Sequence, residues 1–194
     1  MWSGHDKDRN RDFERNGAEC IKFCDTDFRH SKKLSCDDVL VEIATCKKHA
    51  NIETIDFIVL TGGEPALQVD VELLDRLFEN EKADVAIETN GTVPFKEGVG
   101  ENLDWVCVSP KSKDDEVVIR EGDELKVVFP NYNPMDFSSL AEGFKHRLVQ
   151  PCAETTEVGK SRLSTLHLEQ CVEFCMKNPK WCLSMQTHKI LGLP

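Results

Sequence analysis

Hydrophobic and polar positions along the chain alternate between short apolar runs and longer amphipathic segments. Runs such as IDFIVL predict buried strands, whereas segments such as VDVELLDRLFEN place apolar residues on one side at helical spacing. Strands are predicted at 55–60, 84–88, 104–108, 124–129, 145–149 and 181–185. Helices are predicted at 37–49, 70–80 and 165–177.

The first predicted helix carries its apolar residues on one stripe, formed by Val39, Leu40, Ile43 and Ala44. Before it, residues 1–34 are strongly charged and show neither a strand nor a helix period. We expect an irregular loop there.

Short apolar strands that alternate with helices indicate an α/β fold with a mostly parallel sheet. Helices are missing or short between 89 and 103 and between 110 and 123, which favours a partial, irregular β/α barrel. The predicted strands end in TGGEP, ETNG, SPK, PN, QP and QTH. In parallel folds this carboxyl edge binds ligands, so these segments are the candidate site.

The composition argues against several classes of protein, namely nucleic-acid-binding and membrane proteins. The 194 residues fit a single domain over 1–194, and 35 acidic against 24 basic residues give a formal charge of −11. Such a surface repels nucleic acid and anionic membranes. No apolar run approaches the roughly 20 residues of a membrane span, and the N-terminus is too polar for a signal peptide, so we expect a cytoplasmic protein.

Nine cysteines, an odd number in a chain without a secretion signal, argue against a disulfide framework. Cys20 and Cys24 lie in the polar loop and suit zinc or an iron-sulfur cluster, although a fortuitous spacing is as good an interpretation. Asp25, Thr26 and Asp27 follow with oxygen ligands that suit magnesium, or form a solvated turn.

The strand-end motifs are individually bland. Thr61–Pro65 is Gly-rich and would let a ligand approach the backbone, yet most such turns only join a strand to a helix. Glu88–Gly91 offers a carboxylate that could accept hydrogen bonds from ribose hydroxyls, and Ser109–Lys111 adds a hydroxyl and an ammonium group. His167, Cys171 and Cys175 share a helix face and could form a metal site. Core thiols are the favoured interpretation, because buried free cysteine commonly behaves as a small apolar residue.

Together the segments WSG, CDTDF, TGGEP, IETNG, WVCVSPK, ELKVV, LVQP and LSMQTHK resemble the 7-carboxy-7-deazaguanine synthases of the radical S-adenosylmethionine superfamily. The resemblance runs from Trp2 to Pro194. It implies a radical S-adenosylmethionine type of partial barrel and a lyase that converts 6-carboxy-5,6,7,8-tetrahydropterin to 7-carboxy-7-deazaguanine with loss of ammonia. It also implies a [4Fe-4S] cluster that cleaves S-adenosylmethionine, a magnesium ion, a homodimer and an electron donor such as flavodoxin.

The resemblance also implies residue roles. Cys20 and Cys24 would bind the cluster, and Thr26 would bind magnesium. The implied S-adenosylmethionine contacts are Phe23, Asp25, Gly62, Gly63, Glu64, Glu88, Ser109, Pro110, Lys111, Gln150, Pro151 and Cys152. The implied pterin contacts are Thr61, His188 and Pro194.

Two features depart from the family pattern. The family's first cluster cysteine precedes its WSG, whereas this chain begins Met1-Trp2, so we expect the first strand and the substrate loop to be missing as well. Three residues separate Cys20 from Cys24, where the family usually has two. These departures leave two alternatives, namely a truncated, catalytically silent homologue that binds S-adenosylmethionine or dimerises, and a structural zinc module.

The last residues are expected to stay near the ligand edge. Only Lys189–Pro194 follow the QTH segment, and apolar burial of Ile190, Leu191 and Leu193 would anchor this tail. The terminal carboxylate would then lie beside His188 and accept hydrogen bonds from the pterin.

Overall fold

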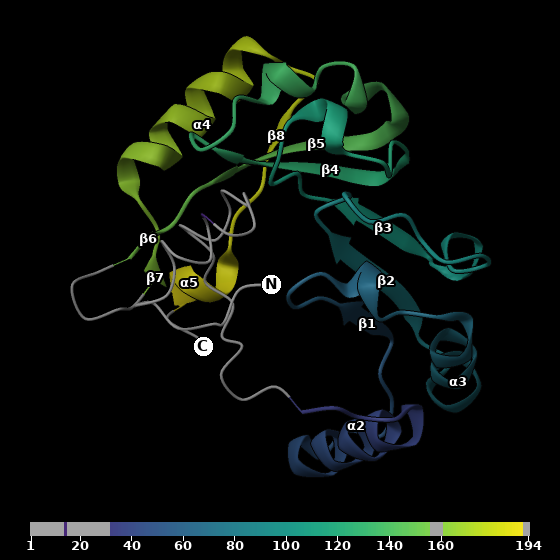
Figure 1. Cartoon of the computed structure of the whole chain (residues 1–194). Coiled ribbons are helices and arrows are strands. Elements are labelled where there is room, and N and C mark those ends of the chain that lie inside the picture. Colours follow the sequence, from purple (N-terminus) through teal and green to yellow (C-terminus); the bar gives the residue numbers. More distant parts are fainter. Residues whose placement is uncertain (1–13, 15–31, 156–160, 192–194) are drawn as a thin grey trace. The chain divides into compact units, whose positions relative to one another are not determined.

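The computed structural model describes residues 14, 32–155 and 161–191. The six main strands form one parallel sheet in the order β1-β2-β3-β4-β5-β8, in which β1 and β8 are the two outer strands (Figure 1). Their bounds are β1 Phe57–Leu60, β2 Asp84–Thr89, β3 Trp105–Val108, β4 Gly122–Phe129, β5 Phe144–Pro151 and β8 Cys182–Leu183. The predicted α/β class with mostly parallel strands is confirmed, and the sheet is open, which is compatible with the predicted partial barrel.

The remaining elements connect these strands. The α-helices are α2 Cys36–Ala50, α3 Val71–Glu81, α4 Thr165–Lys177 and α5 Thr187–Leu191. A short antiparallel pair is formed by β6 Glu154–Thr155 and β7 Ser161–Arg162. Single turns of 3₁₀ helix are η3 Pro65–Leu67, η4 Gly100–Asn102, η5 Asp114–Glu116, η6 Pro134–Phe137 and η7 Leu140–Gly143.

The chain folds as two compact units. The N-terminal unit contains the described residues up to Thr89 together with Val93–Val106, and the C-terminal unit contains Asn90–Thr92 and the described residues from Cys107 onward. A single domain over the whole chain stays a prediction.

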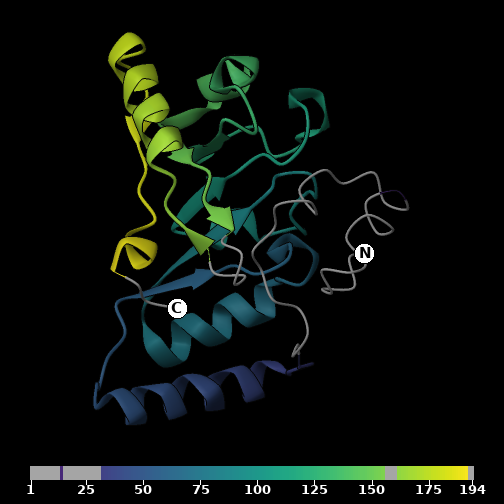
Figure 2. The same ribbon diagram turned by 90° about the vertical axis from the view of Figure 1, so that its left-hand side faces the viewer.

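In the N-terminal unit the helices form successive layers. α3 contacts β2 through a face that buries Leu74 and Leu77, and α2 contacts α3 (Figure 2). α2 therefore lies one layer further from the sheet, and none of its residues is fully buried. The predicted stripe on this helix is only partly covered, since Val39, Leu40 and Ile43 are half-buried and Ala44 is exposed.

Local signals explain why α2 forms despite this thin packing. Ser35 and Asp38 form a capping box, in which each side chain accepts a hydrogen bond from the other residue's backbone N–H. At the far end Asn51 adopts a left-handed conformation with φ 54°, which closes the helix. Lys47 also forms an ion pair of 2.6 Å with Glu81 of α3.

The core of the C-terminal unit is the long β4–β5 pair. Leu125, Val127 and Val149 are fully buried in it, and α4 covers β5 and β8 on one side (Figure 1). Cys171 of α4 is fully buried as well. The prediction that some cysteines act as small core residues is confirmed.

Several bounds differ from the sequence pattern. β8 covers only two of the predicted residues 181–185, because Trp181 turns into the core against Phe174. The β6–β7 pair and α5 were not predicted, since the sequence between 152 and 164 and the C-terminal segment show no clear period.

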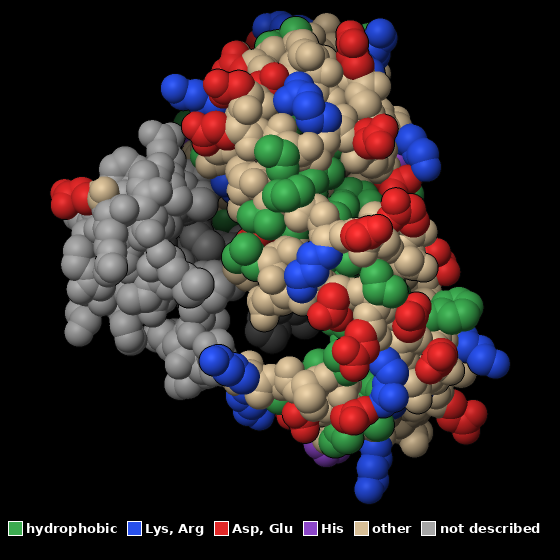
Figure 3. Space-filling model, turned by 45° about the vertical axis from the view of Figure 1, so that its right-hand side comes forward, with side chains coloured by type: hydrophobic (Ala, Val, Ile, Leu, Met, Phe, Trp, Pro, Cys, Tyr) green, Lys and Arg blue, Asp and Glu red, His purple; other side chains and the backbone are tan. Residues whose placement is uncertain are grey.

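No helix in the described part of the chain is long and apolar enough to cross a membrane. Acidic and basic side chains are interspersed over the face drawn in Figure 3. The negative net charge is therefore not gathered into one block on this face.

Candidate functional site

In the N-terminal unit, a carboxylate ties together the ends of β1 and β2. Glu64 follows β1, and its Oε1 accepts a hydrogen bond from the buried Thr89 hydroxyl at 2.5 Å. The same atom accepts the backbone N–H of Ala66 at 3.1 Å, which caps η3. Because β1 and β2 are parallel neighbours, this contact joins their carboxyl ends.

The preceding turn leaves backbone open to a ligand. Gly62 has φ +125°, and a Cβ placed there would meet no atom within 4 Å. Thr61 and Gly63 on either side are exposed. The sequence prediction of a close backbone approach at this turn thus agrees with the geometry.

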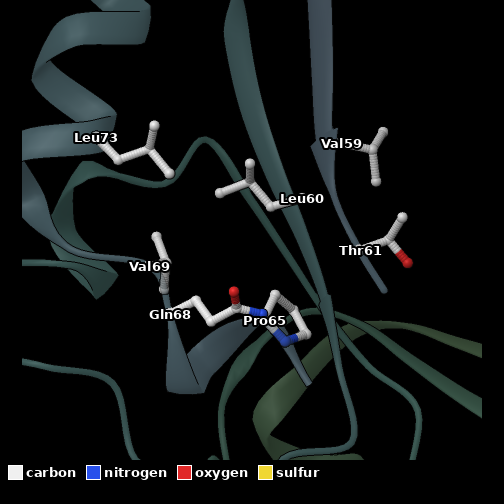
Figure 4. A pocket seen from close by; sticks show the side chains of 7 residues that line it. All are labelled: Val59, Leu60, Thr61, Pro65, Gln68, Val69 and Leu73. Carbon is white, nitrogen blue, oxygen red and sulfur yellow. The ribbon is translucent and has the colours of Figure 1, made fainter. Parts of the chain in front are cut away.

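A hollow of about 280 Å³ lies between the end of β1 and the segment that enters α3 (Figure 4). Thr61 and Gln68 are its polar members, and its walls are otherwise apolar. The lining residues are Val59, Leu60, Thr61, Pro65, Gln68, Val69 and Leu73. Such a lining suits an uncharged ring better than a phosphate group.

In the C-terminal unit, the turn after β2 is held by its own side chains and by the following segment. The Oδ1 atom of Asn90 accepts hydrogen bonds from the backbone N–H of Thr92 at 2.8 Å and from its hydroxyl at 2.6 Å. The carbonyl of Gly91 accepts from Val118 at 2.8 Å and from Ile119 at 3.1 Å. Gly91 has φ +76°, so only glycine fits this turn without strain.

The SPK segment after β3 carries a hydroxyl and an ammonium group in direct contact. Lys111 Nζ donates to Ser109 Oγ at 2.5 Å, while Pro110 between them is fully buried. The carbonyl of Lys111 accepts a hydrogen bond from the Tyr132 hydroxyl at 2.7 Å. Both polar side chains are half-buried, and the segment is fixed at its backbone.

The C-terminal end of β5 and Cys152 after it continue the same edge. Gln150 and Pro151 pair with Val128 and Phe129 of β4, and the Cys152 N–H donates to the Phe129 carbonyl at 2.8 Å. Gln150 is half-buried and Pro151 is buried. Since β3, β4 and β5 are parallel, the SPK and QP segments lie at the same edge of the sheet, as predicted.

The remaining predicted site residues lie on β2, on α5 or outside the described residues. Glu88 is on β2 with its side chain exposed, and His188 lies exposed on α5. The candidate cluster, magnesium and neighbouring positions Cys20, Phe23, Cys24, Asp25 and Thr26, and the terminal Pro194, lie outside the described residues. Within the described residues, no group of three or more His, Cys, Asp or Glu side chains could hold a metal ion.

The predicted burial of the C-terminal tail is wrong for the two anchors that the structure describes. Ile190 is 52% exposed and Leu191 is 65% exposed. The tail starts as α5, whose main contact within the described residues is with the short strand β7. A one-turn helix on a two-residue strand offers too little surface to bury both side chains.

Three side-chain contacts at these segments were not predicted. Thr89 is the partner of Glu64, Tyr132 holds Lys111, and His167 binds the carbonyl of Cys152 through Nδ1 at 2.7 Å. None of these contacts had a local signal in the sequence, because each joins residues that lie 15 or more positions apart.

The chemistry of these segments suits a polar organic ligand. The edge of the C-terminal unit offers a hydroxyl, an ammonium group and a carboxamide, and the turn of the N-terminal unit offers open backbone and a carboxylate. Such groups can bind carboxylates, hydroxyls and nitrogen heterocycles.

Comparison with known proteins gives a consistent result. No family model matches the chain. It is 40% identical to the 7-carboxy-7-deazaguanine synthase of Burkholderia multivorans over 201 residues, which cover 100% of this chain and 85% of that protein. The synthases of Bordetella pertussis and Bradyrhizobium diazoefficiens are 39% and 36% identical, again over 100% of this chain and over 85% and 84% of those proteins.

Proposed function

Because the chain belongs to the 7-carboxy-7-deazaguanine synthase family, we propose that it acts as a radical S-adenosylmethionine lyase. Its reaction would convert 6-carboxy-5,6,7,8-tetrahydropterin to 7-carboxy-7-deazaguanine with release of ammonia. The observation that carries this proposal is the full-length similarity to relatives of that name, which includes the polar strand ends described above.

S-adenosylmethionine contains a carboxylate, ribose hydroxyls and an adenine ring. The donor set of the SPK and QP segments fits these groups: the Lys111 ammonium suits a carboxylate, and the Ser109 hydroxyl and Gln150 amide suit hydroxyl and ring nitrogen atoms. Pro110, Pro151 and Cys152 would shape the same surface. The resemblance assigns Gly62, Gly63, Glu64 and Glu88 to this ligand as well.

The metal groups would be held in the N-terminal segment. We assign Cys20 and Cys24 to the [4Fe-4S] cluster, Thr26 to Mg²⁺, and Phe23 and Asp25 to neighbouring contacts with S-adenosylmethionine. Thiolates are suited to iron-sulfur clusters and hydroxyl oxygen to magnesium. When bound, the cluster supplies the electron for reductive cleavage of S-adenosylmethionine.

The pterin would be bound by Thr61, His188 and the carboxylate of Pro194. Support comes from the hollow beside Thr61, whose mainly apolar walls suit a flat heterocycle. The homodimer and an electron donor such as flavodoxin stay predictions from the resemblance, and the cytoplasmic location stays a prediction from the hydropathy of the sequence.

A direct test is S-adenosylmethionine binding by the chain with a short N-terminal segment that supplies the family's first cysteine, after anaerobic incubation with iron and sulfide, measured by equilibrium dialysis. We expect saturable binding that weakens about tenfold in Lys111→Ala, as loss of a charge-assisted hydrogen bond would cause. The matched control is Lys113→Ala, an exposed lysine two residues away.

Absence of binding in the unsubstituted chain would contradict the proposed function. Equal weakening in both lysine variants would show a general charge effect and would remove Lys111 from the site. Binding without product formation in a cluster-loaded protein would favour the catalytically silent homologue.

A further inference from the structure

The first turn of α4 is attached by two side-chain hydrogen bonds to the segment that follows β5. His167 binds the Cys152 carbonyl through Nδ1 at 2.7 Å, and the Ser164 hydroxyl donates to Glu154 Oε1 at 2.5 Å. Ser164 is also the N-cap of α4 and accepts the His167 backbone N–H at 3.4 Å. The two contacts are thus linked through the cap of the same helix.

The His167 contact fixes which ring nitrogen must carry a proton. A carbonyl oxygen can only accept a hydrogen bond, so Nδ1 must carry the proton. The contact exists for the neutral Nδ1–H tautomer and for the charged imidazolium alike. It therefore holds the carbonyl whether or not Nε2 is protonated.

The effect is to hold Cys152 on both sides. Its N–H donates to Phe129 at the end of β4, and its carbonyl accepts from α4. A peptide segment with its N–H and its carbonyl bound to two different elements can rotate little about its backbone dihedrals. Gln150 and Pro151 precede this fixed point directly.

The second contact is shielded from water on one side only. Ser164 is 2% exposed, whereas Glu154 is exposed, so the Ser164–Glu154 bond is partly buried. It holds the segment two residues beyond Cys152 at the start of β6. The chain after β5 is thus bound to α4 at two successive points.

We propose that His167 is a positioning residue for S-adenosylmethionine binding, which acts by setting the backbone orientation of Gln150–Cys152, with the Ser164–Glu154 pair in support. This inference rests on the proposed function, which assigns these three residues to the cofactor. His167 itself does not contact the ligand. None of the sequence motifs assigned to S-adenosylmethionine includes His167.

The test compares His167→Ala, which removes the donor, with His167→Asn, whose amide nitrogen can take the place of Nδ1. Glu169→Ala, an exposed position on the same helix, is the control. S-adenosylmethionine affinity is measured by equilibrium dialysis, and backbone order by hydrogen exchange of the peptide that contains residues 150–155.

We expect His167→Ala to weaken binding about tenfold and to speed exchange at 152–154, as loss of one net hydrogen bond would. His167→Asn should restore both values to within about twofold of the unsubstituted chain, and Glu169→Ala should change neither. Restoration by Asn separates positioning from a general loss of stability.

Unchanged affinity in His167→Ala, in a chain that binds S-adenosylmethionine, would overturn this inference and leave the proposed function standing. Weak binding in both His167 variants with normal exchange would also overturn it, since the segment would then be ordered without the contact. Failure of the unsubstituted chain to bind S-adenosylmethionine would contradict the proposed function, and this inference with it.

Discussion

At the residue scale, a few buried polar contacts shape the strand ends. Glu64 and Thr89 join the ends of β1 and β2, and Lys111 is held by Ser109 and Tyr132. The sequence predicted these segments as strand ends, because Gly and polar residues follow each apolar run. The partners could not be predicted, since they depend on which strands are neighbours.

Thr89→Val tests the contact at the β1–β2 edge. Valine keeps the shape of threonine but removes the hydroxyl that donates to Glu64. We expect a loss of about 1.5–3 kcal/mol in the free energy of unfolding, the usual range for a hydrogen bond to a charged group. Urea unfolding measures it, with the exposed Thr45→Val as control; equal losses in both variants would contradict a specific role.

Gly91→Ala and Gly62→Ala form a matched pair. Both glycines have positive φ, so alanine strains either turn by about 1–3 kcal/mol. At Gly91 the new Cβ would also lie 2.8 Å from Val108 Cγ1 and 2.9 Å from Val117 Cγ1, which adds about 1–3 kcal/mol of overpacking. Thermal unfolding should show the larger loss for Gly91→Ala, and the opposite order would refute this packing argument.

The thiol of Cys171 on α4 is expected to react more slowly than the exposed thiol of Cys182. Burial, with a smaller effect of the neighbouring Cys175, raises the pKa of Cys171 to about 12. Alkylation requires the thiolate, so Cys171 should be protected at pH 8 while the exposed Cys182 reacts. Peptide mass spectrometry measures both sites, and in denaturant they should react alike; equal native rates would contradict the burial.

The same shift affects stability at alkaline pH. A raised pKa means that folding favours the protonated thiol. This contribution is complete below the ordinary pKa of 9.0 and is lost as the pH rises towards 12.

At the element scale, the hydrophobic periodicity predicted the main helices and strands. The short elements α5, β6 and β7 depend on tertiary contacts. The helix predicted at 165–177 matches α4, and β4 and β5 contain their predicted runs. α5 and the β6–β7 pair were missed because each is held by tertiary contacts rather than by a periodic pattern. α2 was predicted, but the apolar residues on one face of this helix did not show that it packs on α3 rather than on the sheet.

Ser35→Ala tests the stability of α2. The substitution removes the side-chain oxygen that caps the helix, and α2 packs on α3. We expect amide exchange in the first turns of α2 to rise about fivefold while the exchange of α3 stays unchanged. Ser139→Ala is the control, because Ser139 makes no side-chain cap bond in η7. A global rise in exchange would contradict the layered arrangement.

At the scale of the whole molecule, fold class and family were both within reach of the sequence. The ordered strand-end motifs span the chain, and 7-carboxy-7-deazaguanine synthases match it over the full length of the chain. The connection between α4 and the end of β5 was not within reach, because His167 and Cys152 are brought together only by the packing of α4 on β5.

The central claim is tested most directly by product formation. The chain is joined at its N-terminus to a short segment that carries the family's first cysteine, loaded anaerobically with a [4Fe-4S] cluster, and supplied with S-adenosylmethionine, Mg²⁺, a reductant and 6-carboxy-5,6,7,8-tetrahydropterin. We predict that mass spectrometry will detect 7-carboxy-7-deazaguanine, together with ammonia in equal amount. A fully loaded protein that binds S-adenosylmethionine and forms no 7-carboxy-7-deazaguanine would contradict the proposed function.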